Sequence, residues 1–318
     1  MEKYMIVLAV LADLIVGKNR IKEYFAIMTN GIAATLGMKL WDKGEETSKQ
    51  RKKGVVLVCA TIMFSYISAI AVAIALMMLG PWGYFFGSIL IVSLLIMPRS
   101  LSESAYEVRE ALAKGNIVEA RRCTLNIVDH DTDMLGREEL ARATVSAIAD
   151  KLVTKVVSPL FYFMLGDFPL AFMYCVVHGA NSLFSCKNEK YAEFGYAAEK
   201  MDEVLNYIPA RITAMLMVVA SSILRYDTRQ AIATIRRDAD KYPGPNGGCT
   251  EAAMAGALGI RLGGTTYYDG KELKREYIGD VSEQVSEEHI DKAIRLLYTV
   301  VVLFCLLGVL VKMMGGDV

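Results

Sequence analysis

The feature that most constrains the fold of this 318-residue chain is an uncharged apolar run of about 25 residues, from residue 55 to residue 79. A helix of that length crosses the roughly 30 Å hydrocarbon core of a bilayer. A second apolar run, residues 84–97, follows after Gly80-Pro81-Trp82-Gly83. Proline and glycine favour a tight turn, and tryptophan is frequent at membrane interfaces. The two runs therefore predict a transmembrane hairpin.

Three further apolar stretches extend the membrane prediction. Residues 294–313 form one span, and residues 207–224 form another with Pro209 and Arg211 at its start. Residues 1–17 join a charged start to an apolar run, but no small-residue cleavage site follows. This pattern predicts a retained first membrane segment and not a signal peptide. The expected fold is an all-α, polytopic integral membrane bundle.

The apolar stretch at residues 153–180 is interrupted near its middle by Gly166-Asp167-Phe168-Pro169. Two half-length helices that meet at such a break indicate a re-entrant or membrane-buried hairpin. Irregular backbone survives at membrane depth only where it is buried in protein or lines a cavity. A helical hairpin kept for packing alone is the equally open alternative.

Basic residues indicate the orientation of the loops. They cluster between residues 18 and 53, which places that loop in the cytoplasm by the positive-inside rule. Apolar residues recur at helical spacing within 99–151, so this stretch predicts amphipathic helices on the same side. We expect one membrane-embedded domain over 1–318, with N-terminal membrane helices in 1–98, a motif-bearing region in 99–293 and a C-terminal membrane helix in 294–318.

Charge and cysteine usage exclude several function classes. The 35 basic and 35 acidic side chains balance, so long-range steering toward nucleic acid is not expected. None of the six cysteines forms a C-x-x-C pair, and the three histidines are scattered. The chain therefore carries neither a zinc framework nor a disulfide scaffold.

The most informative polar stretch, residues 243–264, reads PGPNGGCTEAAMAGALGIRLGG. A proline- and glycine-rich turn leads into a small-residue helix that is expected to end in Arg-Leu-Gly-Gly. Backbone N–H groups at a helix N-terminus attract anions, so the stretch predicts a phosphate cradle around Asn246, Gly247 and Gly248. Packing against another helix is the alternative role for the Ala-rich helix.

Charged side chains elsewhere could complete a phosphate site. Arg211, Arg237 and Arg261 are candidate bidentate phosphate donors. Magnesium prefers oxygen ligands, and four carboxylates are candidates: Asp202, Glu203, Asp238 and Glu251. Several of them have a purely structural alternative, namely a membrane anchor for Arg211, a solvated helix face for Asp202-Glu203 and a local ion pair for Arg237-Asp238. Asn206, a further candidate, could be only a helix cap.

The polar motifs, taken in chain order, are similar to those of a known family. They are IVDHDT at 127–132, PLFY at 159–162, YAEFG at 191–195, MDEVLNYIPAR at 201–211, RDA at 237–239, PNGG at 245–248, EAA at 251–253 and RLGG at 261–264. Their order, spacing and membrane setting over residues 5–280 resemble the CobD/CbiB family of cobalamin biosynthesis.

The resemblance implies an integral membrane enzyme that converts adenosylcobyric acid to adenosylcobinamide or its phosphate. It implies that an aminopropanol, usually as its O-phosphate, forms an amide with a propionate of the corrin ring, using ATP and Mg²⁺. By this resemblance Asp202, Glu203 and Glu251 are candidate catalytic residues, with Asp202 and Glu251 as metal ligands. The candidate substrate- and phosphate-binding residues are Asp131, Thr132, Asn206, Arg211, Arg237, Asp238, Asn246, Gly247, Gly248, Arg261, Gly263 and Gly264.

The chain also departs from the family pattern, mostly at polar positions. Ser146 stands where the family has glutamate, and Lys18 and Asn181 stand where it has aspartate. The family's Asn-Thr-Leu-Asp-Ser reads His178-Gly179-Ala180-Asn181-Ser182. These changes keep two other functions open, a catalytically impaired paralogue that binds corrinoid or nucleotide, and a transporter with Asp167 near its substrate path.

The expected partners are the lipid bilayer, the corrinoid and the aminopropanol phosphate. A homo-oligomer or a complex with other membrane enzymes of the corrinoid pathway is a further expectation. Convergence of Asp131, Asp202, Asp238 and Glu251 near Asn246 would favour a magnesium–nucleotide site.

Overall fold

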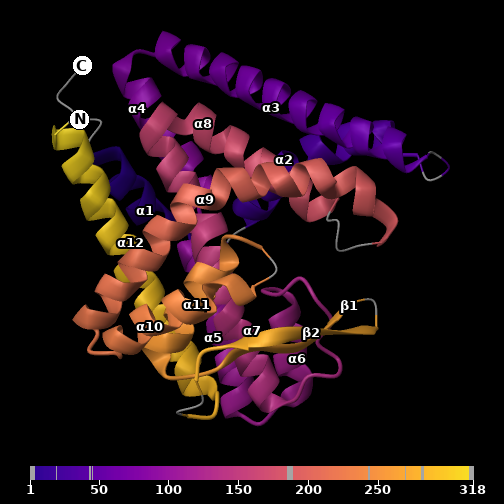
Figure 1. Cartoon of the computed structure of the whole chain (residues 1–318). Helices are drawn as coiled ribbons and strands as arrows, with labels where there is room; N and C mark the ends of the chain where they lie inside the picture. Colours follow the sequence, from indigo (N-terminus) through magenta and orange to yellow (C-terminus); the bar gives the residue numbers. More distant parts are fainter. Residues whose placement is uncertain are drawn as a thin grey trace. The chain divides into compact units, whose positions relative to one another are not determined.

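The computed structural model describes residues 4–18, 20–42, 44, 46–184, 189–242, 244–268, 270–280 and 283–314. Helices dominate the chain (Figure 1). The chain divides into two compact units. The first unit contains residues 1–97, 158–206 and 308–318, and the second contains 98–157 and 207–307. The three-part division expected from the sequence stays a prediction. Pro243, at the start of the proposed cradle, lies outside the described residues.

The first unit is built around a broken helix. Its elements are α1 (Met5–Val16), α2 (Arg20–Leu40), α3 (Thr47–Met78), α4 (Pro81–Leu95), α8 (Ser158–Leu183) and the first part of α9 (Ala192–Ile223). Helices α2, α3 and α4 all pack against α8, whose buried side chains include Phe168 and Tyr174. The core of this unit therefore lies along α8.

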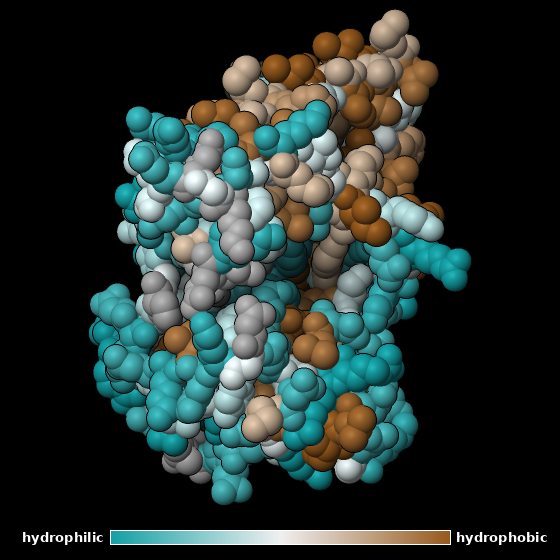
Figure 2. Space-filling view, turned by 90° about the vertical axis from the view of Figure 1, so that its right-hand side faces the viewer, coloured by the Kyte–Doolittle hydropathy of each residue, from teal (hydrophilic) through white to brown (hydrophobic). Residues whose placement is uncertain are grey.

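Five of the six apolar segments expected in the membrane lie in long apolar helical stretches. Five helical stretches are long and apolar enough to cross a bilayer, namely 47–78, 81–113, 137–183, 192–223 and 287–314. Helix α3 exposes large apolar side chains, among them Phe64, Ile67 and Met78. Figure 2 shows hydrophobic side chains gathered over the upper part of the face in view. Such a surface is unfavourable in water and suits a lipid environment. The polytopic all-α fold is confirmed.

Two details of the membrane prediction are wrong. Helix α1 has only 12 residues, about 18 Å of helix, which is too short for the first membrane span expected in residues 1–17. Pro81 does not lie inside a turn, because α4 begins at that residue. A proline is favourable at the first helical position, where its missing N–H costs nothing.

Helix α8 folds back on itself at the predicted break. Gly166 and Asp167 have non-helical dihedrals, with φ of −157° and 54°. In an unbroken helix Tyr162 and Tyr174 would lie about 18 Å apart, yet their rings stack with centroids 5.1 Å apart. The broken segment is therefore confirmed, and it is a hairpin of two half-helices.

The second unit combines amphipathic helices with a β-hairpin. Its elements are α5 (Pro98–Ala113), α6 (Ile117–Leu125), α7 (Arg137–Leu152), α10 (Thr228–Asp238), α11 (Gly247–Leu258), β1 (Leu262–Tyr268), β2 (Lys271–Ile278), the rest of α9 and most of α12 (Glu287–Met314). The helices expected within residues 99–151 are confirmed. Helix α11 is almost completely buried and packs closely on α10, which fits the packing role considered for its small residues.

The β-hairpin corrects the expected end of α11. The helix ends at Leu258, and Gly259 follows in the left-handed conformation, so it does not run into Arg-Leu-Gly-Gly. Arg261 precedes β1, which pairs antiparallel with β2 and has a register shift between Leu262 and Gly264. Gly263 has a φ of 81°, and a Cβ there would overlap the carbonyl oxygen of Glu276. This close approach explains glycine at position 263.

Candidate functional site

The start of α11 is built on the ring of Tyr242. A Cβ on Gly247 would lie 2.7 Å from that ring, so glycine allows the first turn of the helix to sit directly against it. Burial raises the pKa of Tyr242 well above its ordinary value, and Asp150 and Glu251 raise it further. The phenol of Tyr242 therefore stays protonated and neutral.

The structure brings together two of the predicted binding residues, Arg211 of α9 and Asn246. An Nη1–H of Arg211 donates to Asn246 Oδ1 at 3.3 Å, and an Nη2–H donates to the carbonyl of Pro245 at 3.4 Å. The guanidinium lies 3.4 Å from the centre of the Tyr207 ring. Arg211 is thus held beside the first turn of α11, and its role as a membrane anchor stays an open alternative.

Glu251 is buried inside the second unit, with 2% of its surface exposed. Ser146 of α7 donates its hydroxyl to Glu251 Oε1 at 2.5 Å. Ser146 is one of the positions where the sequence departs from the family motif. A carboxylate at position 146 would face the carboxylate of Glu251, and the two negative charges would repel each other. The serine hydroxyl donates a hydrogen bond there instead.

A polar pocket opens next to Ser146, between α7 and the β-hairpin. The polar side chains that line it are His130, Glu139, Arg142, Ser146, Thr265, Thr266 and Arg275. Two of these carry a permanent positive charge, and three are hydroxyls. Such a set of donors suits an anionic ligand.

Arg275 is the cation best placed to bind a ligand in this pocket. Its Nε is buried and has no hydrogen-bond partner within the described part of the chain. Its Nη2 donates to the hydroxyl of Tyr268 at 3.3 Å. Arg142 is more constrained, since it bonds to Glu138 and to the carbonyl of Arg261. A buried donor without a partner costs free energy, which a bound anion would recover.

His130 contributes a neutral ring to this pocket. Burial lowers the pKa of His130, and only smaller effects from Asp131 and Asp129 oppose the shift. The imidazole is therefore uncharged near neutral pH and can both donate and accept a hydrogen bond.

Asp238 and Arg237 are bound to each other. The guanidinium of Arg237 makes two bonds to the carboxylate, at 2.8 and 2.7 Å. Lys241 and the backbone N–H of Gly279 also donate to it, at 2.8 and 2.9 Å. These donors lower the pKa of Asp238, with Arg237 the largest cause. The arrangement joins the end of α10 to the end of β2 and matches the local ion pair considered from the sequence.

Asp202 and Asn206 lie in the first unit, within a buried polar network. Asp202 accepts hydrogen bonds from His178, at 2.9 Å, and from Asn181 and Asn206, both at 3.0 Å. Asn206 Oδ1 in turn accepts from Ser158 and Tyr174. Asn206 is therefore not a helix cap, because it lies inside α9 and binds side chains of α8.

The remaining predicted residues have separate surroundings. Asp131 accepts from the backbone N–H of Gly270 at 2.8 Å, Thr132 donates to the carbonyl of Arg121, and Glu203 pairs with Lys200 at the surface. The guanidinium of Arg261 lies over the ring of Tyr277. Gly264 also packs against this ring, because a Cβ there would come within 2.8 Å of it. Hydrogen bonds tie Asp131 to Gly270, Asp238 to Arg237 and Glu251 to Ser146, and the convergence of these carboxylates considered above stays a prediction.

Magnesium binds in proteins through one or two carboxylates together with phosphate oxygens and water. In the part of the chain that the structure describes, no three His, Cys, Asp or Glu side chains form a metal-binding group. Both oxygens of Asp202 accept hydrogen bonds from amide or imidazole donors. Of the two expected ligands, Glu251 is the one bonded to a residue of the basic pocket, Ser146, and magnesium binding by either stays a prediction.

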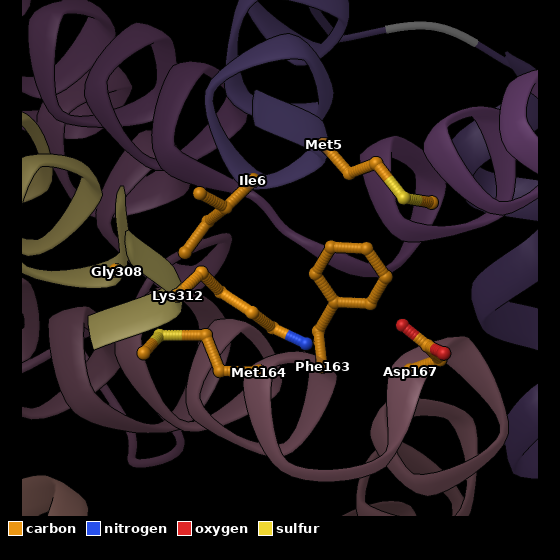
Figure 3. Close-up of a pocket in the computed structure, with 7 residues that line it drawn as sticks. All are labelled: Met5, Ile6, Phe163, Met164, Asp167, Gly308 and Lys312. Carbon is orange, nitrogen blue, oxygen red and sulfur yellow. The ribbon is translucent and has the colours of Figure 1, made fainter. Parts of the chain in front are cut away.

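Another pocket lies in the first unit, beside the turn of the α8 hairpin. Figure 3 shows Lys312 and Asp167 on either side of Phe163, with Met5, Ile6 and Met164 completing an apolar lining. The carboxylate of Asp167 accepts a hydrogen bond from Tyr84 at 3.2 Å. Its mainly apolar lining suits this pocket less well to phosphate than the pocket of the second unit.

Together these features define a polytopic helical membrane protein with a basic pocket next to a buried glutamate. The chain belongs to the CobD/CbiB family. Residues 6–297 match the family described as "CobD/Cbib protein", which confirms the resemblance drawn from the motifs.

Three relatives named "Cobalamin biosynthesis protein CobD" illustrate the relationship. The protein of Clostridium perfringens is 40% identical over 202 residues, which cover 64% of each chain and so less than two thirds of that relative. That of Halalkalibacterium halodurans is 35% identical over 84% of this chain and 83% of its own. That of Yersinia enterocolitica is 34% identical over 74% of each. No solved structure matches the chain.

Proposed function

We propose that this chain forms an amide bond in cobalamin biosynthesis, joining an aminopropanol or its phosphate to adenosylcobyric acid with consumption of ATP. Membership of the family supports the pathway. The pocket lined by Arg142 and Arg275 supports the phosphate-dependent step, because that step needs cations around phosphate oxygens. The single observation that carries the proposal is the buried, unpartnered Nε of Arg275 beside the Ser146–Glu251 pair.

ATP with Mg²⁺ would transfer its terminal phosphoryl group to a propionate carboxylate, which becomes an acyl phosphate while ADP leaves. The amine nitrogen then bonds to the acyl carbon, inorganic phosphate leaves and the amine loses a proton. In this scheme Arg275 and Arg142 would hold phosphate oxygens, and Glu251 would hold the metal. Electrostatic stabilisation of this kind by fixed charges is often the largest contribution to such a reaction.

The test is an assay of the purified full-length protein with adenosylcobyric acid, aminopropanol phosphate and Mg-ATP, with product detected by mass spectrometry. Arg275→Met should lower kcat/KM by at least about 100-fold, as expected for loss of one preorganised donor. The exposed Arg229 of α10 provides the matched control, and Arg229→Met should keep the wild-type rate. Absence of amide product, while a family relative turns over under the same conditions, contradicts the proposal.

The alternative is a paralogue that binds its ligands without turnover. The observations that favour it are the hydroxyl of Ser146 in place of a carboxylate and the full set of donors around Asp202. This alternative predicts corrinoid binding with no ATP consumption. Corrinoid-dependent ATP hydrolysis that Glu251→Gln abolishes would exclude it.

A further inference from the structure

His178 and Asp202 form a dyad in the first unit that the amide-forming chemistry does not use. Nδ1 of His178, on the second half of α8, lies 2.9 Å from Asp202 Oδ1 on α9. An ionised carboxylate only accepts hydrogen bonds, so Nδ1 carries the proton. When the ring carries this single proton, its lone pair is on Nε2.

The dyad is held rigidly from both sides. Asn181 and Asn206 each donate to Asp202 at 3.0 Å, which fixes the carboxylate. The imidazole stacks on Tyr174, with centroids 6.0 Å apart and the planes 10° from parallel. The hydroxyl of Tyr174 is bound in turn to Asn206 at 2.8 Å. Both the tautomer and the plane of His178 are therefore set by the surrounding side chains.

Because Nδ1 of His178 is bonded to Asp202, Nε2 is the ring nitrogen that can bind a ligand. No hydrogen bond to it is found in the described ranges of the chain, and 12% of the side chain is exposed. A histidine whose Nδ1–H is held by a carboxylate is the usual form of a metal-ligating histidine, since the carboxylate orients the ring and raises its basicity. His178 therefore has the features of a metal ligand, with Nδ1 held inside the polar network and Nε2 directed away from it.

We propose that Nε2 of His178 is an axial ligand to the cobalt of the bound corrinoid. The inference rests on the proposed function only in its substrate class, a corrinoid. The nitrogen lone pair would form the cobalt–nitrogen bond and a water molecule on that axial face would leave, with no change in the oxidation state of cobalt. Asparagine, which the family motif has at this position, lacks such a basic nitrogen, so this axial bond would distinguish the present chain from that pattern.

The experiment is electron paramagnetic resonance of the full-length protein in detergent with cob(II)inamide, a corrinoid without a lower-face base of its own. The unpaired electron of cobalt(II) lies along the axial direction, so one bound ¹⁴N splits each cobalt line into three. We expect this triplet with the wild-type protein and a doublet after labelling its histidines with ¹⁵N. Because the isotope test uses the unaltered chain, it does not depend on whether a variant folds.

Variants assign the nitrogen to one residue. His178→Asn should abolish the triplet, whereas His130→Asn, which changes a histidine of the second unit, should keep it. Asp202→Asn should weaken ligation by roughly 10- to 100-fold, the usual effect of losing the partner of a ligating histidine.

Three results would overturn the inference: unsplit lines with bound cob(II)inamide, no binding of the corrinoid, or a triplet that survives in His178→Asn. Failure of the amide assay with the triplet intact would reject the proposed catalysis and leave the cobalt ligand standing. Amide formation together with unsplit lines would reject the cobalt ligand and leave the proposed catalysis standing.

Discussion

At the scale of single residues, Asp238 shows how a predicted binding residue serves the fold. Its carboxylate is fully buried and accepts from Arg237, Lys241 and Gly279. Asp238→Asn keeps the shape but removes the charge, and we expect it to lower the free energy of unfolding by about 2 kcal/mol. Thermal unfolding in detergent, followed by circular dichroism, measures the change.

The pH dependence of this effect has a defined sign. Because the pKa of folded Asp238 lies below its ordinary value of 3.8, its contribution is present above that value and is lost as the pH falls through the folded pKa. The difference between wild type and Asp238→Asn should stay constant from about pH 8 to pH 5 and shrink below about pH 4. A difference that grows on acidification would contradict the assignment.

Gly248 offers a second test at this scale, because it separates packing from ligand binding. A Cβ there would overlap the carbonyl oxygen of Ala239, whereas a Cβ on Gly31 of α2 would meet nothing within 4 Å. Gly248→Ala should destabilise the protein by about 1–3 kcal/mol. Gly31→Ala should leave stability unchanged or raise it by about 0.5–1 kcal/mol. Equal melting temperatures for the two variants, measured without ligand, would show that Gly248 is not kept for packing.

The candidate site could be predicted only in part from the sequence. The pair Arg211 and Asn246 was accessible, because a conspicuous turn and a nearby arginine both point to phosphate. Arg142 and Arg275 were missed, since each looks like an ordinary charge on an amphipathic element until the β-hairpin places both in one pocket. His178 was visible only as a departure from a motif. Its bond to Asp202 joins residues of different helices, which periodicity cannot reveal.

At the scale of elements, the turn of the α8 hairpin gives a prediction about backbone strain. Asp167 has φ 54° and ψ −165°, a region that is nearly exclusive to glycine. Asp167→Gly and Asp167→Ala both lose the hydrogen bond to Tyr84, but only glycine relieves the strain. Asp167→Gly should therefore be more stable than Asp167→Ala by about 1 kcal/mol.

Melting temperatures of the two variants, compared in the same detergent, measure this difference. Asp167→Asn serves as the control, because asparagine keeps a side-chain acceptor and tolerates positive φ better than alanine. Equal stability of the glycine and alanine variants would show that position 167 does not hold the strained conformation.

The sequence was more informative for helices than for strands. Long uncharged runs predicted α3, α4 and α12, because the length of an apolar run is a direct measure of what can cross a bilayer. The β-hairpin was missed, although Asp269-Gly270 between two stretches rich in tyrosine, threonine and charged residues is a typical turn signal. Strand β2 exposes most of its residues, so it lacks the alternation of apolar and polar residues that marks a half-buried strand.

At the scale of the whole molecule, the two units differ in what they give to function. The first carries the 32-residue apolar helix α3 and a buried polar network, and the second carries the basic pocket. Both units are interleaved along the chain, which passes between them within helices α9 and α12. Residues of one motif, such as Asn206 and Arg211, consequently belong to different units, which explains why spacing in the sequence did not group the site residues as the structure does.

The orientation of α3 in the membrane gives the last prediction. The helix has 32 residues, about 48 Å, with Lys49, Arg51 and Lys53 at its start and Leu79 just after its end. The positive-inside rule predicts that the basic end lies in the cytoplasm. In a variant without native cysteines, a membrane-impermeant maleimide added to intact cells should label Leu79→Cys and not Lys49→Cys. After permeabilisation both should react, because both positions are exposed.

The reverse pattern in intact cells would place the basic end outside, and labelling of both would show that α3 does not cross the bilayer.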